Sequence, residues 1–180
     1  MGMSSRERML TALANERPDR LPCQIHGWMP YYLERYLDGM DQWQAFERFG
    51  MDYAIYVNPS YSYDEKDLAN WLVERKGPEI DESGTLCEIV QITTPKGRLC
   101  KKVVHTDVTY YDTEYLLKDL KDFEIWNAYY PVPTAVDFIP IQTAKDRLGD
   151  KGIIRSHPFS PGQGSPWQSF CILFGTEDSI

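Results

Sequence analysis

Polar and aromatic side chains that could bind a ligand lie at the ends of three predicted strands, at residues 21–27, 52–58 and 152–156. In α/β proteins, ligands bind beyond the carboxyl ends of parallel strands. We therefore expect these side chains to line a substrate pocket. The candidates are His26, Trp28, Asn58, Tyr61, His157, Gly164, Ser165 and Trp167. No catalytic residue can be assigned among them, because a catalytic set is defined by its geometry in space.

Two of the three histidines, His26 and His157, stand at such strand ends. An unperturbed histidine titrates near pH 6.5, so either residue could serve as an acid, a base or a ligand. The alternative is that each one only bonds a neighbouring carbonyl. Four tyrosines around the strand at 52–58 could wall a pocket for a large flat ligand, or could belong to the core and the surface. They are Tyr53, Tyr56, Tyr61 and Tyr63.

The segment "SPGQGSPW" has the small residues of a phosphate-binding loop, but it matches neither common pattern. A P-loop needs Lys and then Ser or Thr after its last glycine, and a dinucleotide fingerprint needs GxGxxG at the first strand. The segment instead offers Gly164 for a close backbone approach, Ser165 as a helix cap and Pro166 at the first helical position. An ordinary capped turn explains it equally well.

Charge and cysteine content exclude several classes of function. The net charge of −8 would repel a phosphate backbone, so nucleic acid is not an expected partner. The four cysteines form no CxxC pair, and we expect free thiols and no metal site. No run of about 18 apolar residues occurs and the amino terminus is polar, which favours a cytoplasmic protein that does not contact membranes.

Hydrophobic periodicity predicts an α/β protein that forms one domain over residues 1–180. A capped helix at 4–15 precedes the first strand, and two helices broken at Gly39 join it to the second, which suggests a parallel βαβ unit. An alternating segment at about 70–108 predicts an inserted antiparallel hairpin. Further helices are predicted at 113–127, at 134–149 with a possible kink at Pro140, and from Pro166. Asp52, at the entry of its strand, is expected to be structural.

Several motifs in this order resemble the amino-terminal half of the uroporphyrinogen decarboxylase superfamily. The opening "SSRERMLTALANERPDRLP" is similar to its first helix and Pro-Asp-Arg turn, and "TTPKGRL" to a Thr-Pro-x-Gly turn of its corrinoid-dependent methyltransferase branch. "EYLLKDLKDFEIW", "GQGSPWQSF" and "FGTED" resemble later segments. The resemblance implies a partial TIM (β/α) barrel with an N-terminal helix and the inserted hairpin. It also implies that the chain is about half of that barrel, truncated or split, and completed by self-association or by a second half-barrel chain.

Departures from the decarboxylase pattern favour the methyltransferase branch. No arginine follows the first strand until Arg35, and Gln168 stands where the decarboxylases have threonine. The resemblance then implies methyl transfer between cobalamin and a thiol or methoxylated substrate, with a small molecule or a corrinoid protein as donor. Corrinoid and zinc are implied for the complete enzyme, whereas this part alone is expected to bind neither and to show low activity. The alternatives are a uroporphyrinogen decarboxylase and a non-catalytic binding or assembly subunit.

Overall fold

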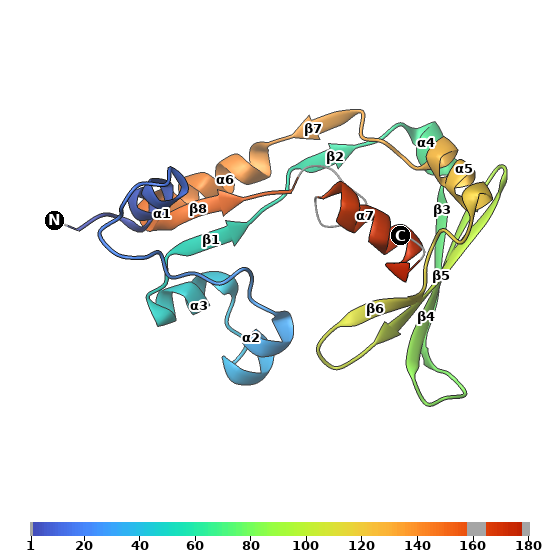
Figure 1. The fold of residues 1–180 in the computed structure, drawn as a ribbon, viewed down its shortest axis with the longest axis horizontal. Coiled ribbons are helices and arrows are strands. Elements are labelled where there is room, and N and C mark those ends of the chain that lie inside the picture. Colours follow the sequence, from blue (N-terminus) through green and yellow to red (C-terminus); the bar gives the residue numbers. More distant parts are fainter. Residues whose placement is uncertain (1, 158–164, 178–180) are drawn as a thin grey trace. The chain divides into compact units, whose positions relative to one another are not determined.

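The chain has a mixed α/β fold with small sheets, seen in a computed structural model that describes residues 2–157 and 165–177 (Figure 1). It divides into two compact units. The first unit comprises Met1–Ser60 and Val136–Ser156, and the second comprises Tyr61–Ala135 and His157–Ile180. The sheets of the described residues contain two, two and four strands, and none of them closes into a barrel.

The first unit begins with three helices. Helix α1 (Ser5–Leu13) is closed by a capping box between Ser4 and Glu7, as the sequence predicted. Helices α2 (Pro30–Tyr36) and α3 (Gln42–Phe49) follow. Asp38 and Gly39 between them have φ angles of 53° and 71°, so the break predicted at Gly39 is confirmed.

A parallel strand pair forms the centre of the first unit. Strand β1 (Tyr53–Tyr56) pairs with β8 (Gly152–Arg155), with Tyr53 opposite Gly152 and Tyr56 opposite Arg155. Helix α6 (Ile139–Leu148) and the short 3-10 helix η1 (Gly149–Lys151) lead into β8. The core of the unit consists of Phe46, Tyr53, Ile55 and Leu148.

The predicted strand at 21–27 is not a strand in the structure, and the predicted βαβ unit is therefore wrong. Only Pro22 and Ile25 of this segment are partly buried, and Pro22 has no N–H to donate to a ladder. A single backbone hydrogen bond, from Asp52 N–H to Cys23 O at 2.7 Å, links the segment to the chain just before β1. The parallel partner of β1 is β8, which the sequence analysis placed as the third strand.

Two short strands, β2 (Ser60–Ser62) and β7 (Ala135–Asp137), pair with each other where the chain leaves the first unit and returns to it. The predicted helix at 134–149 is thus shorter than expected, because its first residues form β7. Pro140 lies in the first turn of α6, where a missing N–H breaks no hydrogen bond, so it causes no kink.

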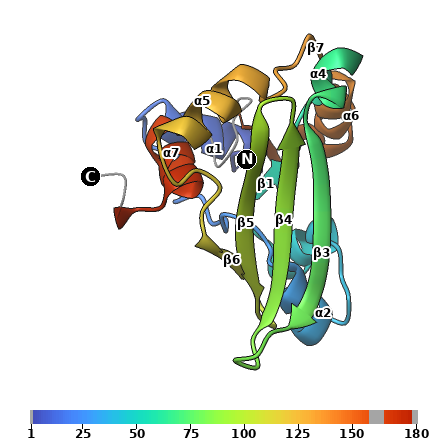
Figure 2. The ribbon, with the colours of Figure 1, turned by 90° about the vertical axis from the view of Figure 1, so that its right-hand side faces the viewer.

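The second unit contains a four-stranded antiparallel sheet, seen face-on in Figure 2. Helix α4 (Glu65–Ala69) precedes the strands, which follow in chain order as β3 (Leu72–Ile80), β4 (Leu86–Thr94), β5 (Gly97–His105) and β6 (Tyr110–Glu114). The predicted hairpin is confirmed as β4–β5, and the sheet adds a strand on each side of it.

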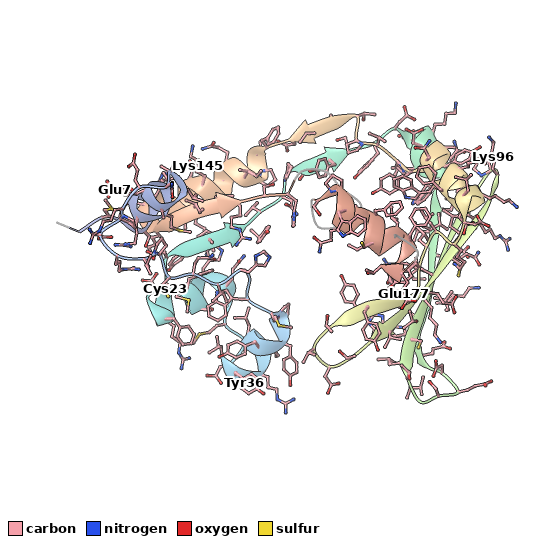
Figure 3. The ribbon with its side chains drawn as sticks, viewed as in Figure 1. Glu7, Cys23, Tyr36, Lys96, Lys145 and Glu177 are labelled. Carbon is pink, nitrogen blue, oxygen red and sulfur yellow. The ribbon has the colours of Figure 1, made fainter. Side chains whose placement is uncertain are left out.

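The Thr-Pro-Lys-Gly segment forms the turn between β4 and β5. The Thr94 hydroxyl donates to Gly97 O at 2.9 Å and accepts from Lys96 N–H at 3.3 Å. The turn lies beside helix α5 (Leu120–Tyr129), near the labelled Lys96 in Figure 3.

The core of the second unit includes a residue of helix α7 (Pro166–Phe174). It consists of Ile92, Leu99, Leu116, Leu117, Ile125 and Leu173.

The prediction of helices from residue 113 is correct only in part, because β6 occupies 110–114 and α5 begins at Leu120. In the described part of the chain, no helix is long and apolar enough to cross a membrane.

Candidate functional site

Arg155 gathers three groups at the carboxyl ends of the parallel strands β1 and β8. Its guanidinium donates to His26 Nδ1 at 2.9 Å, to His26 O at 3.2 Å and to the Tyr56 hydroxyl at 3.0 Å. Tyr56 and Arg155 are the last residues of their strands and lie opposite each other in the register. His26, Tyr56 and Arg155 together are called the strand-end cluster below.

Stacking adds to these hydrogen bonds. The Arg155 guanidinium carbon lies 4.4 Å from the centroid of the Tyr56 ring, and the His26 ring meets the same tyrosine edge-on at 5.7 Å. A guanidinium over an aromatic face is held by the quadrupole of the ring as well as by dispersion. Arg155 is therefore fixed in place while part of its surface stays open to solvent.

The proton position on His26 follows from its partner. Arginine has only donors, so His26 Nδ1 must accept the hydrogen bond from Arg155. The neutral ring then carries its proton on Nε2. Because His26 is exposed, this N–H is a donor available to a ligand at the strand ends.

Asn58, two residues after the end of β1, and Ser156, one residue after the end of β8, extend the polar edge beyond the strands. The Ser156 hydroxyl lies 3.5 Å from Asn58 Oδ1, and both residues are exposed. The edge thus presents a guanidinium, an imidazole N–H, a phenol, an amide and a hydroxyl. Such a set can bind an anionic or multiply hydrogen-bonding group of a small ligand.

Trp28 contributes an apolar recess in the same unit. The recess has a volume of about 390 Å³, and Ile25 and Gly27, the two neighbours of His26 in the chain, both line it. The Trp28 indole stacks on Phe49 at 5.6 Å between ring centroids and meets Phe46 edge-on at 5.7 Å. Its Nε1 atom is buried without a hydrogen-bond partner among the described residues, so a ligand acceptor placed in the recess could bond it.

The other predicted pocket residues belong to the second unit. Tyr61 and His157 are half-buried there. Ser165 caps α7 by accepting from Gln168 N–H at 3.1 Å, which confirms the predicted cap, and Trp167 on the same helix is 58% exposed. Gly164 lies outside the described residues. Of the predicted pocket residues, the structure therefore places His26 beside Arg155 and Asn58 beside Ser156, with Trp28 close to His26 in sequence.

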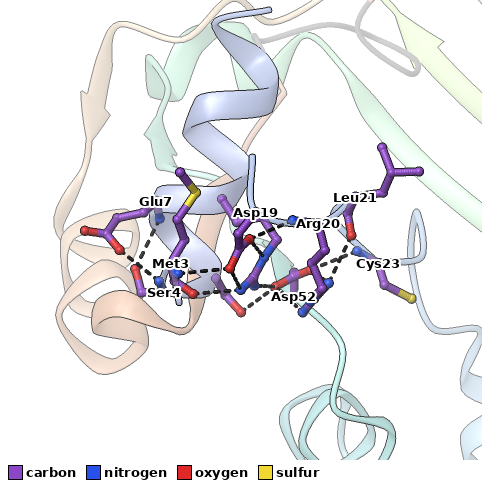
Figure 4. Close-up of polar contacts among 10 residues, drawn as sticks. Met3, Ser4, Glu7, Asp19, Arg20, Leu21, Cys23 and Asp52 are labelled. Carbon is purple, nitrogen blue, oxygen red and sulfur yellow. Dashed lines mark hydrogen bonds and ion pairs between the residues drawn. The ribbon is translucent and has the colours of Figure 1, made fainter. Parts of the chain in front are cut away.

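The entry end of β1 is built around Asp52, the fully buried carboxylate shown in Figure 4. Asp52 accepts from Ser5 Oγ, from Arg8 at 2.6 Å, from Arg20 at 2.8 Å and from Cys23 N–H. Burial alone would raise the pKa of Asp52, but these donors outweigh it and hold that pKa below its usual range. Every oxygen of Asp52 is engaged, so its role is structural, as expected.

Asp19 completes this network from the Pro-Asp-Arg turn. Arg8 Nε donates to Asp19 Oδ1 at 2.7 Å, and this hydrogen bond is the main reason that the pKa of Asp19 falls to about 2. Asp19 also accepts from the backbone N–H groups of Met3 and Arg20. The turn is thereby fixed to α1 and to the start of β1.

No metal centre is formed by residues 2–157 and 165–177, since no three His, Cys, Asp or Glu side chains gather within reach of one ion. All four cysteines are free: Cys23, labelled in Figure 3, is exposed and Cys87 is buried. Burial is the main cause that raises the pKa of the Cys87 thiol, so this thiol is not an activated nucleophile.

Sequence reasoning did not single out Arg155, and it named Tyr56 only as one of four tyrosines that could wall a pocket. Arg155 ends the apolar run "GIIR", and a charged residue at the last position of a buried strand is a signal for the strand-end edge. Its two partner residues, Tyr56 and His26, however, lie 99 and 129 residues away in the chain. Only the β1–β8 pairing brings them together.

Comparison with known proteins adds no relative. No protein family model, curated protein or solved structure matches this chain. Function is therefore inferred from the residues and the geometry of the site.

Proposed function

We propose that this chain is part of a uroporphyrinogen decarboxylase-like (β/α) barrel and takes part in methyl transfer from a corrinoid to a small thiol. The observation that carries the proposal is the strand-end cluster. It places Arg155, His26 and Tyr56 at the carboxyl ends of two parallel strands, which is where barrel enzymes bind their substrates.

Three further observations support the barrel family. The Pro-Asp-Arg turn is fixed to α1 and β1 through Asp19, Arg20 and Asp52, so it positions the segment that carries His26. The Thr-Pro-x-Gly segment forms a tight turn between β4 and β5. Ser165 caps α7 in the Gly-small-Pro-aromatic segment. A complete barrel needs eight parallel strands, so the proposal requires further strands from a second copy or another segment.

The proposed reaction moves a methyl group from cobalt to sulfur. A new bond forms between the methyl carbon and the sulfur of a thiolate, while both electrons of the cobalt–carbon bond stay on cobalt. The proton of the thiol passes to solvent. Arg155 orients an anionic group of the thiol substrate, and the Nε2–H of His26 bonds a second acceptor on the same molecule.

Zinc, which the family resemblance implies as the activator of the thiol, does not fit the described part of this chain, because no set of three ligating side chains is present there. The proposal therefore assigns no step to zinc.

One observation favours the runner-up function, porphyrinogen decarboxylation: Arg155 is a cation at a strand end, where a substrate carboxylate could bind. A non-catalytic binding subunit would keep the cluster without turnover.

Assay of both reactions on the purified chain separates these functions. The chain is incubated without oxygen with methylcobalamin and mercaptoacetate, a small thiol that carries a carboxylate, and the cobalamin spectrum is followed. In parallel it is incubated with uroporphyrinogen, and the loss of carboxylate groups is measured. We expect slow demethylation of methylcobalamin above the rate without protein and no decarboxylation. Decarboxylation alone, or neither reaction, would contradict the methyltransferase proposal.

A further inference from the structure

A second cavity lies in the first unit, at the other end of the parallel strands from the strand-end cluster. It has a volume of about 480 Å³, within the usual range for small-molecule sites. Tyr53, the first residue of β1, and Lys151, the residue before β8, both line it. Because β1 and β8 are parallel, both residues mark the amino ends of the strands. The cavity is called the amino-end cavity below.

Aromatic rings form part of its wall. The Trp43 ring lies 6.2 Å from the Tyr53 ring, measured between centroids, and Tyr53 stacks in turn on Phe46 at 5.1 Å. Phe46 and Tyr53 are buried in the core of the unit, whereas Trp43 is only partly covered. The buried rings of Phe46 and Tyr53 therefore support the wall, and the Trp43 indole lines the cavity.

Three cationic side chains and one carboxylate also line the cavity: Arg48, Arg147, Lys151 and Glu47. Lys151 Nζ donates to Glu47 Oε2 at 2.8 Å, and the Tyr53 hydroxyl donates to the same carboxylate. The hydrogen bond from Lys151 is the main cause that lowers the pKa of Glu47, so Glu47 is ionised at neutral pH. Burial, and then the contact with Glu47, raises the pKa of Tyr53 to about 12, which keeps the phenol neutral. Glu47 is thus occupied by Lys151 and Tyr53.

The two arginines of the cavity have no carboxylate partner in the described part of the chain. Arg147 places its guanidinium carbon 4.1 Å from the Trp43 centroid, and Arg48 contacts only the Met40 sulfur, at 3.8 Å. Both side chains are exposed, and their donors can reach a ligand. Two guanidinium groups that line one cavity without a carboxylate partner among the described residues are unusual in a chain with a net charge of −8.

We propose that the amino-end cavity binds a planar aromatic molecule that carries a phosphate group, such as a nucleoside monophosphate or an aryl phosphate. The forked donors of Arg48 and Arg147 match the geometry and charge of a phosphate dianion. The ring of the ligand packs against the Trp43 indole and the outer face of the Arg147 guanidinium, both of which stack readily on aromatic rings. This site is separate from the strand-end cluster, and its test is independent of methyl transfer.

Titration with adenosine monophosphate and phenyl phosphate, followed by the tryptophan indole N–H signals in NMR spectra, tests the site. The chain has five tryptophans, and a Trp43→Phe variant identifies the signal of Trp43. We expect both compounds to shift that signal saturably. Arg147→Ala and Arg48→Ala should each weaken binding about tenfold or more, because each removes a charge-assisted hydrogen bond.

Arg35→Ala is the matched control. Arg35 also stacks on tyrosine rings in the first unit, at 5.5 Å from Tyr31, but it does not line the cavity. Its removal should leave the affinity for adenosine monophosphate unchanged. The proposal is overturned if neither compound shifts the Trp43 signal, or if Arg147→Ala binds as tightly as the original chain. Equal affinity for adenosine would overturn the role of the phosphate, and equal affinity for inorganic phosphate would overturn the role of the ring.

Discussion

Asp52 and Arg155 show at the level of single residues how structural and functional charge are divided along one strand pair. Asp52, at the entry of β1, is fully buried and has all its acceptor positions filled by Ser5, Arg8, Arg20 and Cys23. Arg155, at the exit of β8, is held by two side chains and still reaches solvent. Asp52 therefore contributes to stability, whereas Arg155 is placed to bind a ligand.

Asp52→Ala should lower the free energy of unfolding by about 3 kcal/mol, because it leaves the buried Arg8 guanidinium without this partner. Urea unfolding followed by circular dichroism measures the change. Asp137→Ala is a suitable control, since Asp137 lies in the exposed strand β7 and its side chain accepts a hydrogen bond from Ile139 N–H. Equal stability of the two variants would contradict the role assigned to Asp52.

Asp19 gives a prediction about pH. Its hydrogen bonds with Arg8, Met3 and Arg20 lower its pKa to about 2 in the folded chain, below the value of about 3.9 expected when unfolded. A lowered pKa contributes stability that is fully present above the unfolded value and is lost as the pH falls toward the folded value. The difference in unfolding free energy between the original chain and Asp19→Asn should therefore shrink between pH 4 and pH 2. A difference that stays constant over that window would contradict this account.

Elements whose ends are marked by local chemistry were predictable from the sequence. Ser4 with Glu7, the Asp38-Gly39 pair and the Ser165-Pro166 pair define the ends of α1, α2 and α7, because each acts within a few residues. The segment at 21–27 shows the opposite case. Its apolar residues suggested a buried strand, but strand formation depends on a partner, and β1 pairs with β8. Strand β3 lies inside the antiparallel segment predicted at about 70–108, but the prediction of one hairpin did not separate it as a further strand, and it is exposed along its whole length.

Gly152 allows β1 and β8 to approach each other, and it supplies a prediction at the level of these elements. A Cβ atom at this position would overlap the backbone carbonyl of Tyr53, which cannot move without breaking the strand pair. Gly152→Ala should therefore cost about 3 kcal/mol of unfolding free energy in a urea titration. Gly27→Ala, where a Cβ meets no atom within 4 Å, should change it by no more than about 0.5 kcal/mol. Similar losses in both variants would contradict the close packing of β1 against β8.

For the molecule as a whole, sequence patterns predicted the α/β class, the β4–β5 hairpin and the strand at 152–156, but not the arrangement of the site. His26 and Asn58 were predicted as neighbours of a ligand, and the structure places both beside strand-end groups of the first unit. Arg155 contacts His26, and Ser156 contacts Asn58, each across more than 90 residues of chain. A contact of that sequence separation depends on the fold, so no local pattern reveals it.

The initial rate of methyl transfer from methylcobalamin to mercaptoacetate tests the central claim most directly. We expect Arg155→Ala to lower this rate about tenfold or more, because the guanidinium that orients the carboxylate is lost. Arg98→Ala, a change at an exposed arginine of β5 in the second unit, should keep the original rate. If Arg155→Ala transfers methyl groups as fast as the original chain, or if the original chain is no faster than buffer, the strand-end cluster is not a methyl-transfer site.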